Sequence, residues 1–370
     1  MQRSQIEKLA TQRSFPTLSI FIPTHRKGQE TKEGLDKTRL KNALKKANNM
    51  LEEADMAKQE RDEFLQSSMS LVENNPTFWS YLKDGLCIYK NQDVFEYFVL
   101  PISFKEEVKL SDTFYLRPLL PYLHGEGRFF LLSLELNNVQ LFEGSEQTLD
   151  EIDLGDKVKA GLDKYLDEYE LKQDSLQSQA TGRGGPRMFH GHGGKKDEKK
   201  VETQNFLRQI DQAVMAVLYN ETAPLILAGV DYVVHMYRDV SRYGHIAKDH
   251  ISGSPKGMNE TELREKADEI TEEVFRIDLN ALKTQYDAMK AHGRAASDPK
   301  EILQSARQGR IERLMINEEE EIKGYYDEEE FKVVFDGESD HDILNMTAVQ
   351  TFLKDGLIYE LAPEDMPDDD

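Results

Sequence analysis

The sequence predicts an α/β protein with three domains, and three observations support this prediction. Apolar runs of strand length alternate with longer segments in which apolar residues recur every three or four positions. The chain has 370 residues, which is more than an ordinary single domain. A long stretch without apolar periodicity, residues 172–200, interrupts its middle. We therefore expect domains at residues 1–125, 126–222 and 223–370.

The first domain is predicted to combine strands and helices. A buried strand at 17–22 ends at a loop that begins with Pro23. A helix with one apolar face follows, and we expect Asp36 to be its N-cap. The remaining elements are a helix at 57–74, strands at 85–89 and 95–100, and a linker at 118–127.

The second domain is predicted to have an α/β core with one long loop. Two apolar strands separated by Asn137 and Asn138 predict a tight β-hairpin, because asparagine tolerates the positive φ of such turns. Residues 172–200 hold too few large apolar side chains to order themselves by burial, so we expect an exposed loop. The helix after the loop carries an apolar stripe that includes Leu207 and Ile210.

The third domain is predicted to be of the α/β sandwich type, because strands and helices alternate from Pro224 onward. Asn259 and Glu262 predict a capping box at the start of a long helix. Gly356 is expected at the C′ position of a later helix. The expected elements lie at 225–230, 259–291, 298–309, 310–316, 340–354 and 357–361.

Composition narrows the class of protein. The formal net charge is −22, and acidic runs gather toward the C-terminus, including an acidic tail. No stretch approaches the roughly 20 apolar residues of a membrane-spanning helix, and the first residues lack the apolar segment of a secretory signal. The one cysteine, Cys87, can form no internal disulfide. These features predict a cytoplasmic protein without a membrane partner.

The loop at 172–200 places a basic cluster inside this acidic chain. Its cations can neutralise phosphates and its glycines permit close approach of the backbone, so the residue types point to RNA. The glycines do not follow the pattern of a phosphate-binding P-loop, and a flexible linker is the alternative. The candidate RNA-binding residues are Arg183, Gly184, Gly185, Arg187, His190, His192, Lys195, Lys196, Lys199 and Lys200.

A second candidate site consists of His25, Arg26 and Lys27, which follow a predicted strand. Loops at strand ends often hold functional groups, although a histidine that is merely hydrogen-bonded in a loop is the simpler interpretation. His190 and His192 lack an acidic or cysteine partner nearby, so we expect no metal and no other cofactor. No catalytic triad or paired-carboxylate motif stands out, and no catalytic residue is assigned.

The order of these motifs resembles a known superfamily. The hairpin is followed by Gly-Arg-Gly-Gly at 182–185, Pro-Leu-Ile-Leu-Ala-Gly at 224–229 and Ala-Arg-Gln-Gly-Arg-Ile-Glu-Arg-Leu at 306–314. This order resembles the middle and C-terminal domains of the archaeo-eukaryotic class-1 release factors and of Pelota. The bacterial, Balon-like branch of that superfamily is also similar at 18–26, 38–42 and 345–353.

The resemblance implies a tRNA-shaped factor that occupies the A site of idle or stalled ribosomes, in hibernation or in rescue. The implied partners are the ribosome, through rRNA near the peptidyl transferase centre, and a translational GTPase such as elongation factor Tu. In release factors the loop reads Gly-Gly-Gln, and the glutamine helps to position water against the peptidyl-tRNA ester. Here Pro186 follows Gly184 and Gly185, so we expect binding without hydrolysis.

Two alternatives stay open. One is an enzyme of the same superfamily that hydrolyses peptidyl-tRNA or cleaves tRNA, with His190, His192 or Arg183 supplying the chemistry. The other is a scaffold that binds another protein through its acidic C-terminal domain.

Overall fold

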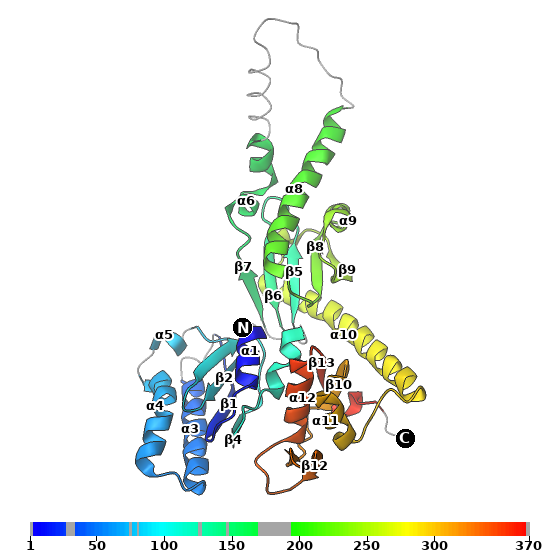
Figure 1. The fold of residues 1–370 in the computed structure, drawn as a ribbon. Helices are drawn as coiled ribbons and strands as arrows, with labels where there is room; N and C mark the ends of the chain where they lie inside the picture. The colour runs from blue at the N-terminus through cyan, green and yellow to red at the C-terminus, as the bar shows by residue number, and fades with distance from the viewer. Residues whose placement is uncertain are drawn as a thin grey trace, which may run out of the picture. The chain divides into compact units, whose positions relative to one another are not determined.

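The computed structural model describes residues 3–26, 34–73, 76–79, 81–124, 128–145, 148–168 and 194–367, without the side chains of residues 76, 77, 157 and 194–199. Figure 1 shows the ribbon. The chain divides into two compact units. Unit 1 combines Met1–Gly127 with Leu279–Asp370, and unit 2 is Arg128–Asp278.

The N-terminal part of unit 1 contains an antiparallel four-stranded sheet in the order β3-β2-β1-β4. The register sets Ile20 opposite Ile88 on one side and Val108 on the other. The elements of this part are α1 (Arg3–Ala10), β1 (Thr17–Pro23), α3 (Leu35–Glu53), α4 (Lys58–Glu73), α5 (Pro76–Trp79), β2 (Gly85–Lys90), β3 (Phe95–Leu100) and β4 (Glu107–Ser111).

Both faces of this sheet are buried, because successive side chains of a strand point to opposite faces. Leu18 and Ile20 of β1 pack in one cluster with residues of α3 and α4. Phe21 lies in another cluster that includes Phe352 and Ile358 from the C-terminal part of the chain. The two ends of the chain therefore share one hydrophobic core.

The C-terminal part of unit 1 contains two small sheets and two helices. β10 pairs in parallel with β13, and β11 pairs with β12 as an antiparallel hairpin. Leu303 and Ile343 are fully buried in a cluster with Val333 of the hairpin. The elements are α11 (Pro299–Arg307), β10 (Arg313–Asn317), β11 (Gly324–Asp327), β12 (Lys332–Phe335), α12 (Ile343–Leu353), β13 (Leu357–Leu361) and η4 (Pro363–Asp365).

Arg117 joins the two parts of unit 1 from a buried position. Its guanidinium group donates to the carboxylates of Glu360 at 2.5 Å and Asp342 at 3.4 Å. It also donates to the backbone carbonyls of Asn317, Glu318 and Glu320. Burial raises the pKa of Asp342 and of Glu360, and the positive charge of Arg117 opposes that rise.

The segment after Arg117 is part of the core instead of the expected linker. It forms the short helices η1 (Arg117–Leu119) and η2 (Pro121–His124), and Leu119 and Leu120 are fully buried. The side-chain oxygen of Asn345 accepts hydrogen bonds from the backbone N–H groups of Leu116 and Arg117. The linker prediction was wrong because these apolar residues pack in a core with residues more than 200 positions away in the sequence.

Unit 2 is a three-layer α/β/α structure on a mixed sheet of order β7-β6-β5-β8-β9. β5, β8 and β9 are parallel, whereas β6 and β7 are antiparallel to their neighbours. The elements are β5 (Phe129–Ser133), β6 (Gln140–Gly144), β7 (Leu149–Ile152), α6 (Asp156–Lys159), α8 (Gly194–Leu218), β8 (Leu225–Gly229), α9 (Asp231–Val240), β9 (Ile246–Ser252), η3 (Pro255–Gly257) and α10 (Glu260–Ala291).

The alternating side chains of β5 separate the two cores of unit 2. Leu132 lies with Ile210 of α8 and Val234 of α9 in the core on one face. Leu131 lies with Leu263 of α10 in the core on the other face. The capping box predicted for α10 is confirmed, because Asn259 and Glu262 exchange backbone-to-side-chain hydrogen bonds of 3.0 Å.

Unit 2 differs from the predicted domain organisation. The boundary expected between residues 222 and 223 falls inside it, because β8 extends the sheet by pairing in parallel with β5. The loop expected over 172–200 ends earlier, since α8 begins at Gly194. Lysine, aspartate and glutamate at 195–200 have good or fair helix propensity, and extending an anchored helix costs far less than nucleating one.

The hairpin and two helix ends also differ from expectation. Ser133 pairs with Gln140, so the β5–β6 connection has six residues, and Asn137 instead binds the side chain and backbone N–H of Asp163. The N-cap of α3 is Gly34, with φ at 68°, and not Asp36. At the end of α12 the left-handed residue is Asp355, with φ at 63°, and not Gly356.

Cys87 lies fully buried on β2, and burial raises the pKa of its thiol. A thiol in this state reacts slowly, since the thiolate is the nucleophile. We expect an aromatic disulfide reagent to release almost no thiolate from the folded protein over minutes and a full equivalent after unfolding in urea. Rapid release from the folded protein would show that this face of the sheet opens.

Candidate functional site

Most of the loop candidates lie outside the described residues. They are Arg183, Gly184, Gly185, Arg187, His190 and His192, together with Lys27 of the second candidate site. Lys195, Lys196 and Lys199 are described only by their backbone, in the first turns of α8. Lys200 is fully described, and its side chain is exposed on the same helix.

Helix α8 fixes where the basic segment joins unit 2. Its stripe of Phe206, Leu207, Ile210, Val214 and Leu218 is fully buried against the sheet. Among the side chains of α8 that the structure describes, Glu202 is the first buried one, and Lys200 and Val201 before it are exposed. Figure 1 shows this half of α8 extending away from the sheet. The anchored half thus holds the basic half in a fixed direction within unit 2.

The second candidate site is a hydrogen-bonded cluster at the end of β1. The Nδ1 atom of His25 lies 2.8 Å from Oδ1 of Asp36, and the backbone N–H of His25 donates to Oδ2 at 2.8 Å. Arg39, one helical turn after Asp36, donates to Oδ1 at 3.1 Å and reaches Glu106 with its Nε. The Asp36 side chain is only 4% exposed, so its charge is held by these partners.

Arg26 forms a separate pair beside this cluster. Its guanidinium group binds both carboxylate oxygens of Asp84, at 3.2 and 3.0 Å, and the Asp84 side chain is 6% exposed. Thr24 binds the same segment through the carbonyls of Lys83 and Asp84. Two buried carboxylates therefore fix the residues that lead out of β1.

Sequence reasoning found His25 and Arg26 but missed Asp36, Arg39 and Asp84 as their partners. Asp36 and Arg39 are three residues apart in a predicted helix, so they can form an i,i+3 ion pair. This spacing is the one signal that could have identified them as partners. Asp84 gives no signal, because it lies 58 positions after Arg26 and meets it only through β1–β2 pairing.

Replacing Asp36 by alanine is expected to destabilise unit 1 by roughly 1–3 kcal/mol, because the buried backbone N–H of His25 and the Arg39 guanidinium lose their acceptor. Urea unfolding followed by fluorescence of the single tryptophan, Trp79, measures this change. The matched control is Asp62→Ala on the exposed side of α4. Equal stability of the two variants would contradict the role assigned to Asp36.

A third polar cluster lies at the carboxyl ends of the parallel strands of unit 2. Oδ1 of Asp231 accepts from Ser252 Oγ at 3.1 Å and lies 3.1 Å from Nε2 of His250. These hydrogen bonds lower the pKa of Asp231. His250 meets both partners through one ring nitrogen, Nε2, so it cannot relay a proton from Ser252 to Asp231 as a triad does.

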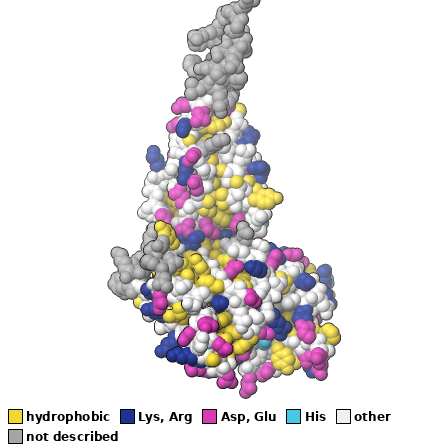
Figure 2. Space-filling model, turned by 60° about the vertical axis from the view of Figure 1, so that its left-hand side comes forward, with side chains coloured by type: hydrophobic (Ala, Val, Ile, Leu, Met, Phe, Trp, Pro, Cys, Tyr) yellow, Lys and Arg dark blue, Asp and Glu magenta, His cyan; other side chains and the backbone are white. Residues whose placement is uncertain are grey.

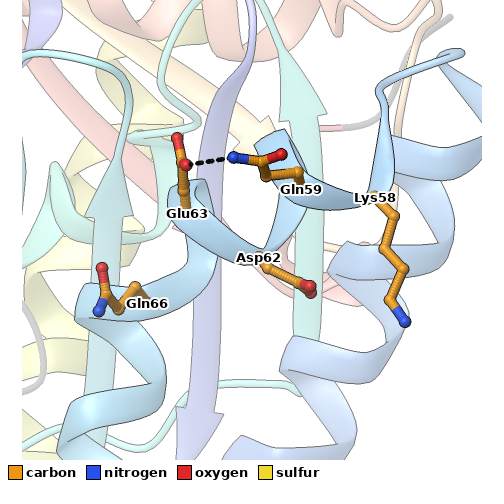
Figure 3. A pocket seen from close by; sticks show the side chains of 5 residues that line it. All are labelled: Lys58, Gln59, Asp62, Glu63 and Gln66. Atoms are coloured by element: carbon orange, nitrogen blue, oxygen red, sulfur yellow. Dashed lines mark hydrogen bonds between the residues drawn. The ribbon is translucent and has the colours of Figure 1, made fainter.

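Two hollows and the distribution of potential metal ligands complete the description of these surfaces. Groups of three or more potential metal ligands do not occur among them. A shallow, open hollow of about 500 Å³ lies over one side of α4 (Figure 3), and one of about 300 Å³ lies between α6 and α8. In the described part of the chain no helix combines the length and apolar character needed to cross a bilayer.

The three-layer unit, with its anchored helix α8, lies within a segment that is similar to a known family. Residues 128–310 match the model of the bacterial archaeo-eukaryotic release factor family 3. Over these residues the chain is similar to that family. The matched segment contains all of unit 2, including the basic stretch between α6 and α8.

Solved structures and curated proteins add little to this assignment. An archaeal protein and the archaeal translation termination factor aRF1 each align over 98% of this chain, at 10% identity and a TM-score of 0.27. The alignments cover 91% and 92% of those chains, respectively. No curated protein sequence matches the chain.

Proposed function

We propose that this protein is a ribosome-associated translation factor that occupies the A site of idle or stalled ribosomes, in hibernation or rescue. The observation that carries the proposal is the family match over residues 128–310. The matched segment includes the basic cluster from Arg183 to Lys200, whose charge suits rRNA in an otherwise acidic chain. The proposed location is the cytoplasm, and the proposed second partner is a translational GTPase such as elongation factor Tu.

The same segment supports binding without hydrolysis of peptidyl-tRNA. Pro186 stands where release factors carry the glutamine of Gly-Gly-Gln. Proline offers neither a side-chain amide nor a backbone N–H with which to position water. Purified protein added in excess to stalled ribosomes should therefore leave peptidyl-tRNA intact, as measured by gel electrophoresis. Release of the peptide or cleavage of the tRNA would support the enzyme alternative.

Ribosome binding should be sensitive to salt. Six loop cations at a slope of roughly −0.7 each give about −4 in log K against log salt concentration. Raising salt from roughly 50 to 200 mM should therefore weaken binding by ~10²-fold or more. Co-sedimentation with vacant bacterial ribosomes through a sucrose cushion measures the affinity. Binding that is insensitive to salt would contradict a phosphate-binding role for this cluster.

The double variant Arg183→Ala, Arg187→Ala should weaken co-sedimentation and flatten the salt slope. The matched control is Lys248→Ala, Lys256→Ala, which removes two exposed charges from unit 2 outside the cluster. Equal loss of affinity in both variants would indicate a general charge effect, and the loop assignment would then be dropped.

A further inference from the structure

Helix α3 of unit 1 carries a basic face in a strongly acidic chain. From Lys37 to Leu51 the sequence contains five basic residues and no acidic residue, although the net charge of the whole chain is −22. Lys37, Lys41 and Lys45 follow one another at intervals of four residues, so they form a row with about 6 Å between neighbours along the helix axis. Lys46 lies beside this row, and Lys41, Lys45 and Lys46 are exposed.

These lysines have no polar partner among the described residues of unit 1. Within the part of the chain that the structure describes, no hydrogen bond or ion pair joins their side chains to another residue. Like charges four residues apart destabilise a helix, and a cation in the first turn, as Lys37 is, opposes the helix dipole. The row therefore costs stability, which favours a role in binding.

The opposite face of α3 anchors the helix to the sheet. Leu40, Leu44, Ala47 and Leu51 are buried in the core that β1 and α4 complete. The basic face is thus held on a fixed scaffold and points outward, with Thr38, Asn42 and Asn49 exposed among the lysines. Hydroxyl and amide groups of this kind donate hydrogen bonds to phosphate and ribose oxygens.

Acidic side chains lie beyond the C-terminal end of the basic face. Glu52 and Glu53 follow it at the end of α3, and α4 then exposes Glu60, Asp62 and Glu63. Figure 3 shows Asp62 and Glu63 on α4, where Glu63 binds Gln59. Acidic, basic and apolar side chains are interspersed elsewhere on the surface that Figure 2 presents. The acidic side chains of α4 would repel a polyanion bound to α3 from that side.

We propose that the exposed face of α3, defined by Lys37, Lys41, Lys45 and Lys46, binds the phosphate backbone of RNA. The proposal deepens the proposed function, on which it rests for the source of the RNA, and adds a second contact with rRNA outside unit 2. An anionic membrane is a poorer partner, because the apolar side of α3 is buried in the core and cannot enter a bilayer.

The test compares the full-length double variant Lys41→Gln, Lys45→Gln with the wild type. Glutamine keeps the length and nearly the helix propensity of lysine, so the helix should remain folded. The matched control, Lys8→Gln, Lys58→Gln, removes two exposed charges from unit 1 outside this face. Each protein is titrated across salt concentrations against vacant ribosomes by co-sedimentation, and against a labelled RNA hairpin and phosphatidylglycerol vesicles by fluorescence anisotropy.

The α3 variant is expected to bind both ribosomes and the hairpin about tenfold more weakly than the wild type at moderate salt. Its slope of log K against log salt should be shallower by roughly 1.5. The control should match the wild type. Equal binding by the α3 variant and the wild type would overturn this inference and leave the proposed function standing. Loss of hairpin binding in the α3 variant, with no ribosome pelleting by any protein, would support an RNA surface and contradict the proposed function. Lysine-dependent capture by vesicles alone would overturn RNA as the ligand.

Discussion

Replacing Arg117 by alanine is expected to destabilise unit 1 by about 3–5 kcal/mol. The substitution leaves the buried carboxylate of Asp342 and the partly exposed carboxylate of Glu360 without their positive partner. It also leaves three backbone carbonyls without their shared donor. The loss is large because the Asp342 carboxylate that remains cannot reach water without opening the core.

The cost of Arg117→Ala should depend on pH. Burial raises the pKa of Asp342 and Glu360, and loss of the arginine removes an interaction that opposes the rise. A carboxyl group whose pKa is raised in the folded state binds a proton more readily there than in the unfolded state, so stability falls as pH rises through that window. The defect should therefore be greatest at neutral pH and shrink as the pH approaches about 4, the ordinary range of these groups.

Urea unfolding followed by Trp79 fluorescence, at neutral and at mildly acidic pH, measures both effects. The matched control is Arg13→Ala, because Arg13 is 69% exposed and pairs with Asp112 at the surface. Such a pair contributes roughly 1 kcal/mol or less. If Arg117→Ala lost no more stability than Arg13→Ala, the buried network would not hold unit 1 together.

Replacing Leu207 by alanine is expected to destabilise unit 2 by roughly 2–5 kcal/mol, as truncation of a fully buried leucine does. Leu207 lies in the core between α8 and the sheet, so the change leaves a cavity there. Hydrogen–deuterium exchange in β8 reports on this core directly. The neighbouring Arg208→Ala, on the exposed side of α8, should shift stability by about 0.5 kcal/mol or less. Similar exchange in the two variants would mean that this helix face is not packed.

Much of the local structure could be predicted from the sequence. The apolar run at 17–22, the stripe through Leu207 and Ile210, and the capping box at Asn259 each contain their own signal within one element. β4 and β9 carry no run of apolar residues, because Lys109 interrupts β4 and Lys248 and Asp249 interrupt β9. These two segments form strands because they pair with β1 and β8. The residue pattern of one short segment cannot predict such pairing.

The candidate sites also include residues that the sequence could predict and residues that it could not. His25 and Arg26 could be found because they follow a recognisable strand, and the basic cluster because its composition departs from the rest of the chain. The partners of His25 and Arg26 could not be predicted from the sequence. Asp36 and Asp84 reach them only after β1, β2 and α3 have come together. The shared core of unit 1 was missed for a similar reason, since Phe21 and Phe352 are more than 300 positions apart.

The split composition of unit 1 has a consequence for synthesis. A ribosome makes residues 1–127 first, and unit 2 then emerges before Leu279 and the residues that complete unit 1. Until β13 and α12 leave the exit tunnel, the sheet face that contains Phe21, Cys87 and Tyr89 has no cover from them. During synthesis, therefore, the N-terminal half of the unit 1 core stays exposed while unit 2 can already fold. Apolar surface exposed in this way promotes aggregation or chaperone binding.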